Sequence, residues 1–491
     1  MDNININLPG GTRYVHMLGI NGISMSGLAE ILLARGLRVS GSDLNASART
    51  EALRGRGAAI YYGNAAEYID ASDPPDLLVY TAAAAADNPE RARAAELGIE
   101  CIDRAALLGL IMADHELSIG VAGTHGKTTT CAMASAILLA DGRDPTINIG
   151  GEYAGIGGNS RIGGRELFLA EACEYTDTFL KLRPSIAVVT NIEYDHVDYF
   201  RDLAHMRDSF AKYCDRAGVA VVANADDANV EMIRAGFCGA AGAGDGGGDG
   251  GEAGGSCGRN WISFGIRSHG ADFTASDVSF DDRDMGSFTL NIKDGGAARR
   301  LRLRVPGTYN VYNALAAAAA ATAAGCSADA VVRGLEGFGG VKKRFEHKGT
   351  AAGFDIYDDY AHHPSEVRTA LEAMKKFARG GRLICVFQPH TYTRTKAFLA
   401  EFGGAFAAAD RVMLADIFPA READPGDISS AMLAAEINRA GGRAAYYFGG
   451  FPEIAEIIMQ TAKPGDLVVT MGAGLASQVA DIILAQTRKN L

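Results

Sequence analysis

Apolar residues along the chain form two kinds of segment that alternate. Short apolar runs, such as 14–20 (YVHMLGI) and 117–123 (LSIGVAG), have the length and composition of buried strands. Segments with apolar residues at helical spacing follow them, such as 28–36 (LAEILLARG) and 128–142 (TTTCAMASAILLADG). Strands that alternate with helices predict an α/β protein with parallel sheets.

This alternation restarts twice, which divides the chain into three predicted domains. A length of 491 residues suits about three domains of ~150 residues each. We place them at residues 1–112, 113–338 and 339–491. Residues 238–258, within the second domain, are very rich in glycine. The conformational entropy lost on ordering them would exceed the free energy gained by burying their few side chains. We expect this segment to be a mobile surface insertion without a chemical role.

The overall charge and the apolar pattern argue against several classes of protein. A formal net charge of -12 disfavours binding to nucleic acid or to an anionic membrane through the field of the whole protein. No apolar run approaches the ~20 residues that span a bilayer, and the opening MDNININLPG does not resemble a signal peptide. The eight cysteines include no C-x-x-C pair, so we expect reduced thiols without zinc. These features predict a cytoplasmic protein.

The segment GTHGKTTT, residues 123–130, lies between a predicted strand and a predicted helix. A loop that binds phosphates needs small residues so that backbone N–H groups converge, a lysine, and a hydroxyl that can bind magnesium. The usual spacing G-x-x-x-x-G-K-[ST] would need a glycine at Val121, so this loop is a shorter one. We predict that it binds ATP, against the alternative of an ordinary turn, through Gly123, Thr124, His125, Gly126, Lys127, Thr128 and Thr129.

Further segments occur with this loop in a fixed order over almost the whole chain. They are GINGISMSGLAEILLARGLRVSGSD, GVAGTHGKTTT, EACEYTDTFLKLRP, VVTNIEYDHVDYF, PGTYNVYNALAA, GVKKRFE, DDYAHHPSEV, FQPHTYTRTKAF, DIFPARE and MGAG. Each segment alone is a weak signal, but ten in order are specific. The chain resembles the Mur ligase family.

This resemblance implies a fold and a reaction. It implies a Rossmann-like N-terminal domain for a UDP-sugar, a central P-loop ATPase-like domain, and a Rossmann-like C-terminal domain that closes over the site. The implied reaction uses ATP and Mg²⁺ to join L-alanine to the lactyl carboxylate of UDP-N-acetylmuramate, through an acyl phosphate, for peptidoglycan. We expect small-molecule partners only, and a monomer or a homodimer.

The resemblance also implies roles for individual residues. It implies catalytic roles for Lys127, His196, Arg344, Asp359 and His362; magnesium binding by Thr128, Glu171 and His196; ATP contacts by Asn310, Asn313 and Arg344; UDP-sugar contacts by Gly19, Gly22, Ser26 and Asp43; and amino-acid contacts by His390 and Arg394. Glu174 and Asn191 are expected to lie beside the magnesium ligands.

Several positions depart from the family pattern, and other functions stay open. The departures are Asn21, Ser24, Asn64, Tyr309 and Thr391. Asn21 and Ser24 stand where the family usually has glycine, so we expect strain there if the backbone needs a positive φ. The alternatives are another Mur-type ligase, which recycles a tripeptide or adds a different amino acid, and an ATP-driven switch protein. A nicotinamide site in the first domain is a weaker alternative.

Overall fold

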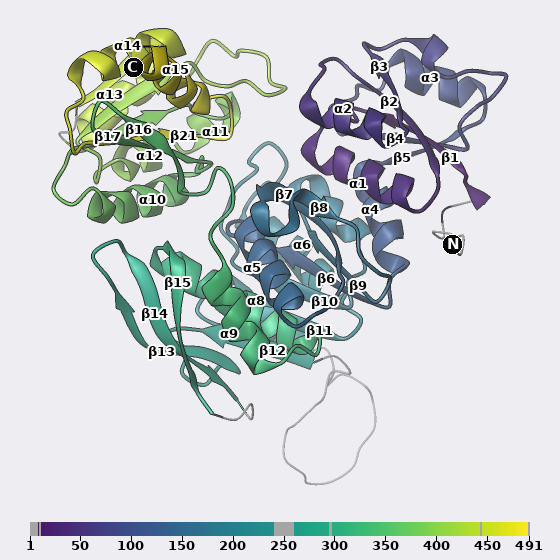
Figure 1. Cartoon of the computed structure of the whole chain (residues 1–491), viewed down its shortest axis with the longest axis horizontal. Coiled ribbons are helices and arrows are strands. Elements are labelled where there is room, and N and C mark those ends of the chain that lie inside the picture. The colour runs from purple at the N-terminus through teal and green to yellow at the C-terminus, as the bar shows by residue number, and fades with distance from the viewer. Residues whose placement is uncertain (1–7, 9–10, 240–259, 294–296, 442–443, 490–491) are drawn as a thin grey trace.

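The structure, a computed structural model, describes residues 8, 11–239, 260–293, 297–441 and 444–489. Its strands form three separate sheets, one in each third of the chain, and helices pack on all of them. Figure 1 shows the first sheet (purple) and the third sheet (yellow-green) on opposite sides of the middle one. The predicted three-part α/β fold is therefore confirmed. The predicted insertion at 238–258 lies almost wholly outside the described residues.

The first sheet has five parallel strands in the order β3-β2-β1-β4-β5. They are β1 (Tyr14–Leu18), β2 (Arg38–Asp43), β3 (Ala59–Tyr62), β4 (Leu77–Tyr80) and β5 (Glu100–Asp103). The helices are α1 (Ile23–Ala34), α2 (Ala48–Gly55), α3 (Pro89–Glu96) and α4 (Arg104–Ala113). The strand order reverses between β1 and β4, and open parallel sheets bind ligands at the carboxyl ends of strands around such a point.

The middle sheet has ten strands in the order β15-β14-β13-β12-β11-β10-β6-β9-β7-β8. They are β6 (Leu117–Ala122), β7 (Thr146–Tyr153), β8 (Gly158–Arg161), β9 (Leu167–Glu171), β10 (Ile186–Val189), β11 (Ala220–Asn224), β12 (Asn260–Gly265), β13 (Phe273–Phe280), β14 (Met285–Ile292) and β15 (Arg299–Pro306). Strands from β13 to β7 in this order run parallel, while β14, β15 and β8 add antiparallel edges. The helices are α5 (Lys127–Ala140), α6 (Leu203–Cys214), α7 (Ala228–Gly239), α8 (Thr308–Ala323) and α9 (Ala328–Gly337).

The third sheet has six strands in the order β16-β17-β21-β18-β19-β20, of which only β16 runs antiparallel to its neighbour. They are β16 (Glu346–Ala351), β17 (Phe354–Asp359), β18 (Leu383–Phe387), β19 (Arg411–Ala415), β20 (Ala444–Gly449) and β21 (Leu467–Met471). The helices are α10 (Pro364–Phe377), α11 (Tyr392–Ala397), α12 (Leu399–Ala405), α13 (Ser430–Gly441), α14 (Phe451–Thr461) and α15 (Ser477–Lys489). Short 3-10 helices cover Ala66–Tyr68, Ala154–Ile156 and Tyr175–Lys181.

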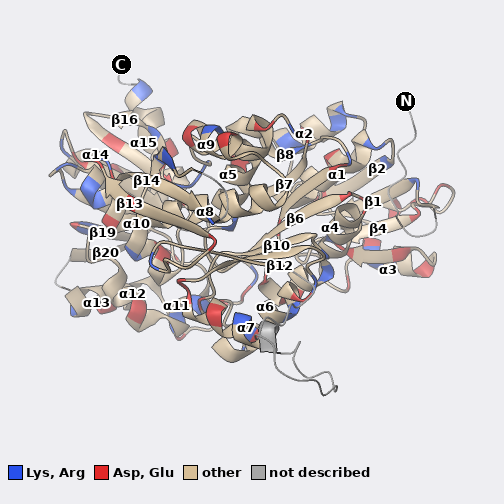
Figure 2. Cartoon of the chain, turned by 90° about the horizontal axis from the view of Figure 1, so that it is seen from below, with Lys and Arg blue, Asp and Glu red and all other residues tan. Residues whose placement is uncertain are grey.

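Basic and acidic residues are interspersed over the outer helices of all three parts (Figure 2). Among the described residues, no helix has the length and apolar character needed to cross a membrane.

Helix α5, which follows the phosphate loop, is fixed by close packing against α8 and α9. Every residue from Ala316 to Ala321 of α8 is fully buried, and such small side chains let neighbouring elements approach closely. On α9, a Cβ at Gly334 would lie 2.5 Å from the Cα of Ile137 in α5. Helix α5 therefore rests on a rigid base, with its closest contact in its C-terminal half.

We predict that Gly334→Ala lowers the free energy of unfolding by about 1–3 kcal/mol, because a methyl group cannot enter this contact without moving the backbone. Urea denaturation measures the change. The control is Gly337→Ala at the exposed end of the same helix, where a Cβ would have no neighbour within 4 Å. We expect that control to change stability by ~0.5 kcal/mol or less, or to raise it slightly. Equal stability of the two variants would contradict the rigid contact.

Candidate active site

The loop of residues 123–126 joins the end of β6 to the start of α5. Both of its glycines have positive φ angles, 139° at Gly123 and 83° at Gly126. A Cβ at Gly123 would collide with Thr190, and a Cβ at Gly126 would collide with Asn313. The loop is thus wedged between the end of β10 and helix α8, and the first turn of α5 has the unpaired N–H groups that make helix N-termini suited to anions.

Lys127, the first residue of α5, is held by oxygen atoms of the loop and of a buried carboxylate. Its Nζ donates to the carbonyl oxygens of Gly123 and Thr124, and lies 3.0 Å from a carboxylate oxygen of Glu174. Glu174 is 1% exposed and also lies 3.4 Å from the Nε2 of His196. Burial opposes both charges, but their attraction outweighs it, so the pKa of Lys127 is raised and the pKa of Glu174 is lowered.

The three residues expected to bind magnesium lie at the same edge of the middle sheet. Thr128 is the second residue of α5, and Glu171 ends β9, the strand next to β6. The Oε1 of Glu171 accepts a hydrogen bond of 2.6 Å from the N–H of Gly150. His196 joins this edge through its contact with Glu174. A hydroxyl, a carboxylate and an imidazole beside an anion site form a donor set that fits a magnesium ion held together with phosphate oxygens.

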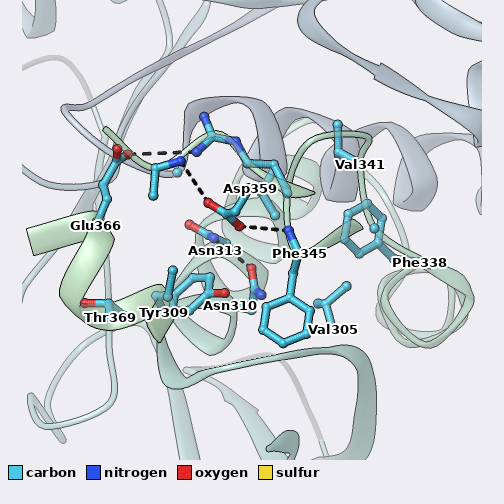
Figure 3. A pocket seen from close by; sticks show the side chains of 16 residues that line it. Val305, Tyr309, Asn310, Asn313, Phe338, Val341, Phe345, Asp359, Glu366 and Thr369 are labelled. Atoms are coloured by element: carbon cyan, nitrogen blue, oxygen red, sulfur yellow. Dashed lines mark hydrogen bonds and ion pairs between the residues drawn. The ribbon is translucent and has the colours of Figure 1, made fainter. Parts of the chain in front are cut away.

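A pocket opens between the phosphate loop, α8 and the third part of the chain (Figure 3). It contains about 640 Å³ of space not filled by protein atoms, part of which is open solvent. Asn310 and Asn313 face it from the first turns of α8. The Nδ2 of Asn313 donates to the Oδ1 of Asn310 at 3.0 Å, and the Nδ2 of Asn310 donates to Pro306 O at 2.7 Å. Tyr309, one of the departures from the family pattern, lines the same pocket as Asn310 and Asn313, two of the residues expected to contact ATP.

Asp359 enters the pocket from the end of β17 (Figure 3). Its two carboxylate oxygens accept hydrogen bonds of 2.8 Å from the N–H groups of Phe345 and Ala361. Burial raises the pKa of Asp359 to about 6, although Arg344 and these N–H groups favour the charged form. Arg344 also lies over the ring of Tyr360, 5.1 Å from its centroid.

His125 in the phosphate loop connects the middle part to the third part of the chain. Its Nδ1 lies 3.0 Å from Glu366 at the start of α10, and its Nε2 lies 2.8 Å from Glu193 in the loop after β10. Burial opposes a charge on this imidazole, but the two carboxylates outweigh it and raise the pKa of His125 to about 10. The sequence predicts a contact of His125 with ATP, whereas in the structure its side chain bridges two carboxylates.

Arg394, expected to contact the amino acid, forms a second connection of this kind. Its Nε and Nη2 donate to the two oxygens of Asp195 at 2.9 and 3.2 Å, and both side chains are less than 10% exposed. Its Nη1 donates to the carbonyl oxygen of His390 at 2.8 Å. The rings of His390 and His362 are 5.9 Å apart. The residues expected to contact phosphate and amino acid therefore form one continuous group.

The residues expected to contact the UDP-sugar lie at the carboxyl ends of β1 and β2. Gly19 has a φ of 75° after β1, and Gly22 precedes the first turn of α1. The Oδ2 of Asp43 accepts a hydrogen bond of 3.1 Å from the N–H of Asn21. The hydroxyl of Ser26 donates to the carbonyl of Ile23 in its own helix, at 3.0 Å.

The expected strain at two departures from the family pattern does not occur. Neither Asn21 nor Ser24 is among the residues with a positive φ, because the chain makes its left-handed turn at Gly19. At a third departure, the Oδ1 of Asn64 accepts from the amide of Asn88 at 3.2 Å. At a fourth departure, the hydroxyl groups of Thr391 and Thr393 share a hydrogen bond of 3.1 Å. Position 391 therefore supplies no second arginine beside Arg394.

Comparison with protein families gives three matches that follow one another along the chain. The model for the Mur ligase family catalytic domain matches residues 14–116, the Mur ligase middle domain matches 121–240, and the Mur ligase glutamate ligase domain matches 343–474. The chain belongs to the Mur ligase family. The predicted family is therefore confirmed.

Individual relatives within the Mur ligase family match over nearly their whole length. The UDP-N-acetylmuramate–L-alanine ligase of Acetivibrio thermocellus is 46% identical over 489 residues, which is 99% of this chain and 98% of that protein. The enzyme of the same name from Alkaliphilus metalliredigens is 42% identical and covers 96% and 97% of the two chains. The crystal structure of UDP-N-acetylmuramate-alanine ligase from Thermotoga maritima has a TM-score of 0.78, 26% identity, and covers 97% of this chain and all of that one.

Four residues of the site were not among those singled out from the sequence. Glu193, Asp195, Ser365 and Glu366 all contact residues that were predicted. The sequence offered indications for three of them. Glu193 and Asp195 are acidic residues that follow a buried strand. Glu366 completes a capping box at the third position of α10. Which partners they take across the structure was not visible in the sequence.

We predict that Asp359 titrates near pH 6, well above an ordinary aspartate. The ¹³C carboxyl signals of aspartate-labelled protein measure this, and Asp359→Asn identifies the signal that disappears. Because Arg344 lowers the pKa of Asp359, Arg344→Met should move the midpoint to a higher pH. A midpoint near 4, or one that falls in the Arg344→Met variant, would contradict the buried environment assigned to this carboxyl.

Proposed function

We propose that this Mur ligase joins L-alanine to the lactyl carboxylate of UDP-N-acetylmuramate with cleavage of ATP to ADP and phosphate. The observation that carries the proposal is 46% identity, over almost all of both chains, to a relative named for this reaction. The arrangement of the site supports it, because the phosphate loop and the histidine–arginine group expected to contact the amino acid lie on two sides of one junction between domains.

The reaction needs an activated carboxylate, because an amine does not displace oxygen from a carboxylate ion. Transfer of the terminal phosphoryl group of ATP to the lactyl carboxylate gives an acyl phosphate and ADP. The alanine nitrogen then attacks the acyl carbon, the C–N bond forms, and the C–O bond to phosphate breaks. Enzymes speed such transfers mainly by positioning the reactants and neutralising phosphate charge.

The charged groups of the junction are suited to these two tasks. We assign phosphate neutralisation to Lys127 and the N-terminus of α5 from one side, and to Arg344 from the other. Asn310 and Asn313 serve the adenine end, since an amide can both donate to and accept from a purine edge. Asp359 and His362 face the transferred phosphate.

The N-terminal sheet serves the sugar nucleotide. The N-terminus of α1 supplies N–H groups for the diphosphate of UDP, with Gly19 and Gly22 allowing close approach and Ser26 and Asp43 beside them. We propose residues 1–112, 113–338 and 339–491 as the three domains. We further propose that the protein acts in the cytoplasm, as a monomer or a homodimer.

We assign magnesium to Thr128, Glu171 and His196. When bound, the ion neutralises phosphate oxygens and orients the terminal phosphoryl group. The support comes from the donor set and from the position of these residues beside Lys127, where Glu174 already balances one positive charge. Glu171 is oriented by its hydrogen bond from Gly150.

The rival reaction is ligation of a different amino acid or of a tripeptide. The curated relatives at 40–46% identity carry names of alanine ligases, which favours alanine. A phosphate-release assay with UDP-N-acetylmuramate, ATP and each of the twenty amino acids, and then the tripeptide, decides between them. We expect the highest kcat/KM with L-alanine; a higher value with the tripeptide would favour the rival.

We predict that ADP formation depends on UDP-N-acetylmuramate and L-alanine together, and that Lys127→Ala lowers its kcat by roughly 10²–10³-fold because phosphate charge is left unbalanced. The control is Lys293→Ala, an exposed lysine of the middle sheet, which should keep full activity. ATP hydrolysis without the sugar nucleotide, at an undiminished rate, would instead favour the switch protein considered above.

We predict that Glu171→Gln raises the Mg²⁺ concentration needed for half-maximal activity by about tenfold, because a carboxylate is lost from the ion. Titration of the activity with MgCl₂ measures it, and direct calorimetric titration of Mg²⁺ into the ATP-saturated protein gives a second readout. The matched control is Glu166→Gln, just before β9. An unchanged Mg²⁺ requirement would remove Glu171 from the proposed ligands.

A further inference from the structure

The buried pair of Asp195 and Arg394 joins the middle and C-terminal parts of the chain at the amino-acid end of the site. Asp195 follows β10 and directly precedes His196, whose backbone N–H donates to Asp195 Oδ1 at 2.7 Å. Arg394 lies in α11, after β18. The two side chains are 6% and 8% exposed. A two-pronged arginine–carboxylate pair of this kind fixes the plane of the guanidinium group as well as its position.

These contacts use most of the hydrogen-bonding capacity of Arg394. A guanidinium group has five N–H bonds. Nε and Nη2 each direct one to Asp195, and Nη1 directs its two to the carbonyl oxygen and the Nδ1 of His390, at 2.8 and 3.0 Å. At most one N–H remains for a substrate. Arg394 therefore cannot form a two-pronged pair with the alanine carboxylate unless it gives up a hydrogen bond to Asp195 or to His390.

The contact with Nδ1 also determines the state of His390. Arginine only donates, so the Nδ1 of His390 must be an acceptor without a proton. Burial and the charge of Arg394 lower the pKa of His390 to about 4, so the ring is neutral near pH 7 and carries its single proton on Nε2. Phe418 holds the ring from one side, with the two ring centroids 5.6 Å apart and the planes 15° from parallel.

His362, whose ring centroid is 5.9 Å from that of His390, has the opposite arrangement. Its Nδ1 lies 3.0 Å from the carbonyl oxygen of Tyr360, and a carbonyl only accepts, so Nδ1 carries the proton. Burial lowers the pKa of His362 to about 3, so this ring is neutral too and its Nε2 is an acceptor. The planes of the two rings are 70° apart. A donor and an acceptor on neighbouring rings match the carboxylate and the ammonium group of a free amino acid.

We propose that Asp195 is a positioning residue for the amino-acid substrate: through Arg394 it holds His390 as an Nε2–H donor to the amino-acid carboxylate, beside the ring of His362, whose Nε2 is an acceptor. The proposal rests on the function proposed above. Since Asp195 and His390 belong to different domains, the amino-acid site is complete only when these domains are packed together.

The kinetic test compares Asp195→Asn with the wild-type enzyme. The amide keeps the shape but lacks the charge that holds the guanidinium group, so we expect the KM for L-alanine to rise about tenfold or more. The KM values for ATP and UDP-N-acetylmuramate should stay within about twofold. The matched control is Asp208→Asn on the exposed side of α6, which should change none of the three. Equal increases for ATP and alanine would overturn the proposal in favour of a general effect on domain packing.

A spectroscopic test needs no substrate. In the full chain labelled with ¹⁵N-histidine, His390→Gln and His362→Gln identify the two ring signals. We expect protonated Nε2 at His390 and protonated Nδ1 at His362. Asp195→Asn and Arg394→Lys should both shift His390 toward a mixture of the two forms, because neither keeps the two-pronged pair. A proton on Nδ1 of His390 in the wild type, or no change in either variant, would overturn the proposal.

The two tests separate this proposal from the function on which it rests. If the wild-type enzyme forms no ADP in response to L-alanine, the proposed function fails, and the histidine signals still report on Asp195. If alanine is the substrate and the signals contradict the expected forms, only the positioning role fails. The folding of Asp195→Asn and Arg394→Lys is checked by the dispersion of their amide spectra. If one of these two variants unfolds, the other is used in its place.

Discussion

Charges buried between the middle and C-terminal parts of the protein are stable only in pairs, and here the pairs cross that boundary. His125 of the phosphate loop meets Glu366 of α10, and Arg394 of α11 meets Asp195 after β10. Leaving one member of a buried pair without its partner typically costs ~3–5 kcal/mol. Separation of the domains would therefore leave Asp195, Arg394 and Glu366 without these partners, while His125 keeps Glu193, and the site exists as one unit only while the domains are packed.

The shape of the phosphate loop is held by contacts within the middle part of the chain. Gly123 and Gly126 adopt left-handed conformations and touch Thr190 and Asn313, so the loop has no room for a side chain at either position. Asn313 in turn contacts Asn310, and both line the pocket beside the loop. The backbone of the loop and the two amides of the pocket are thus held by direct contact. A change in one is transmitted to the other.

The sequence predicted the strands, helices and turns that depend on neighbouring residues. It did not predict which side chains that are distant in the sequence contact one another. The strand at 117–123, the loop and the helix that ends before Gly142 were placed correctly, because length, apolar spacing and glycine position are visible within a few residues. The pairing of Asp195 with Arg394 joins residues 199 positions apart, and nothing in either segment indicates the other. The predicted role of Arg394 therefore missed the carboxylate that already holds it.

Two buried carboxyl groups of the same pocket have opposite pKa displacements, and the reason lies in what surrounds each. Burial favours the neutral form of Glu366, but the positive charge of His125, with that of Arg344 beside it, outweighs burial and keeps the pKa of Glu366 well below the usual range. Asp359 has only Arg344 and two backbone N–H groups on its side, so burial prevails and its pKa is about 6. Phosphate groups placed beside Arg344 would add negative charge near Asp359 and favour its neutral form further. Of the two, Asp359 is thus the carboxyl group whose protonation depends on the charge placed beside Arg344, while Glu366 keeps its charge and its contact with His125.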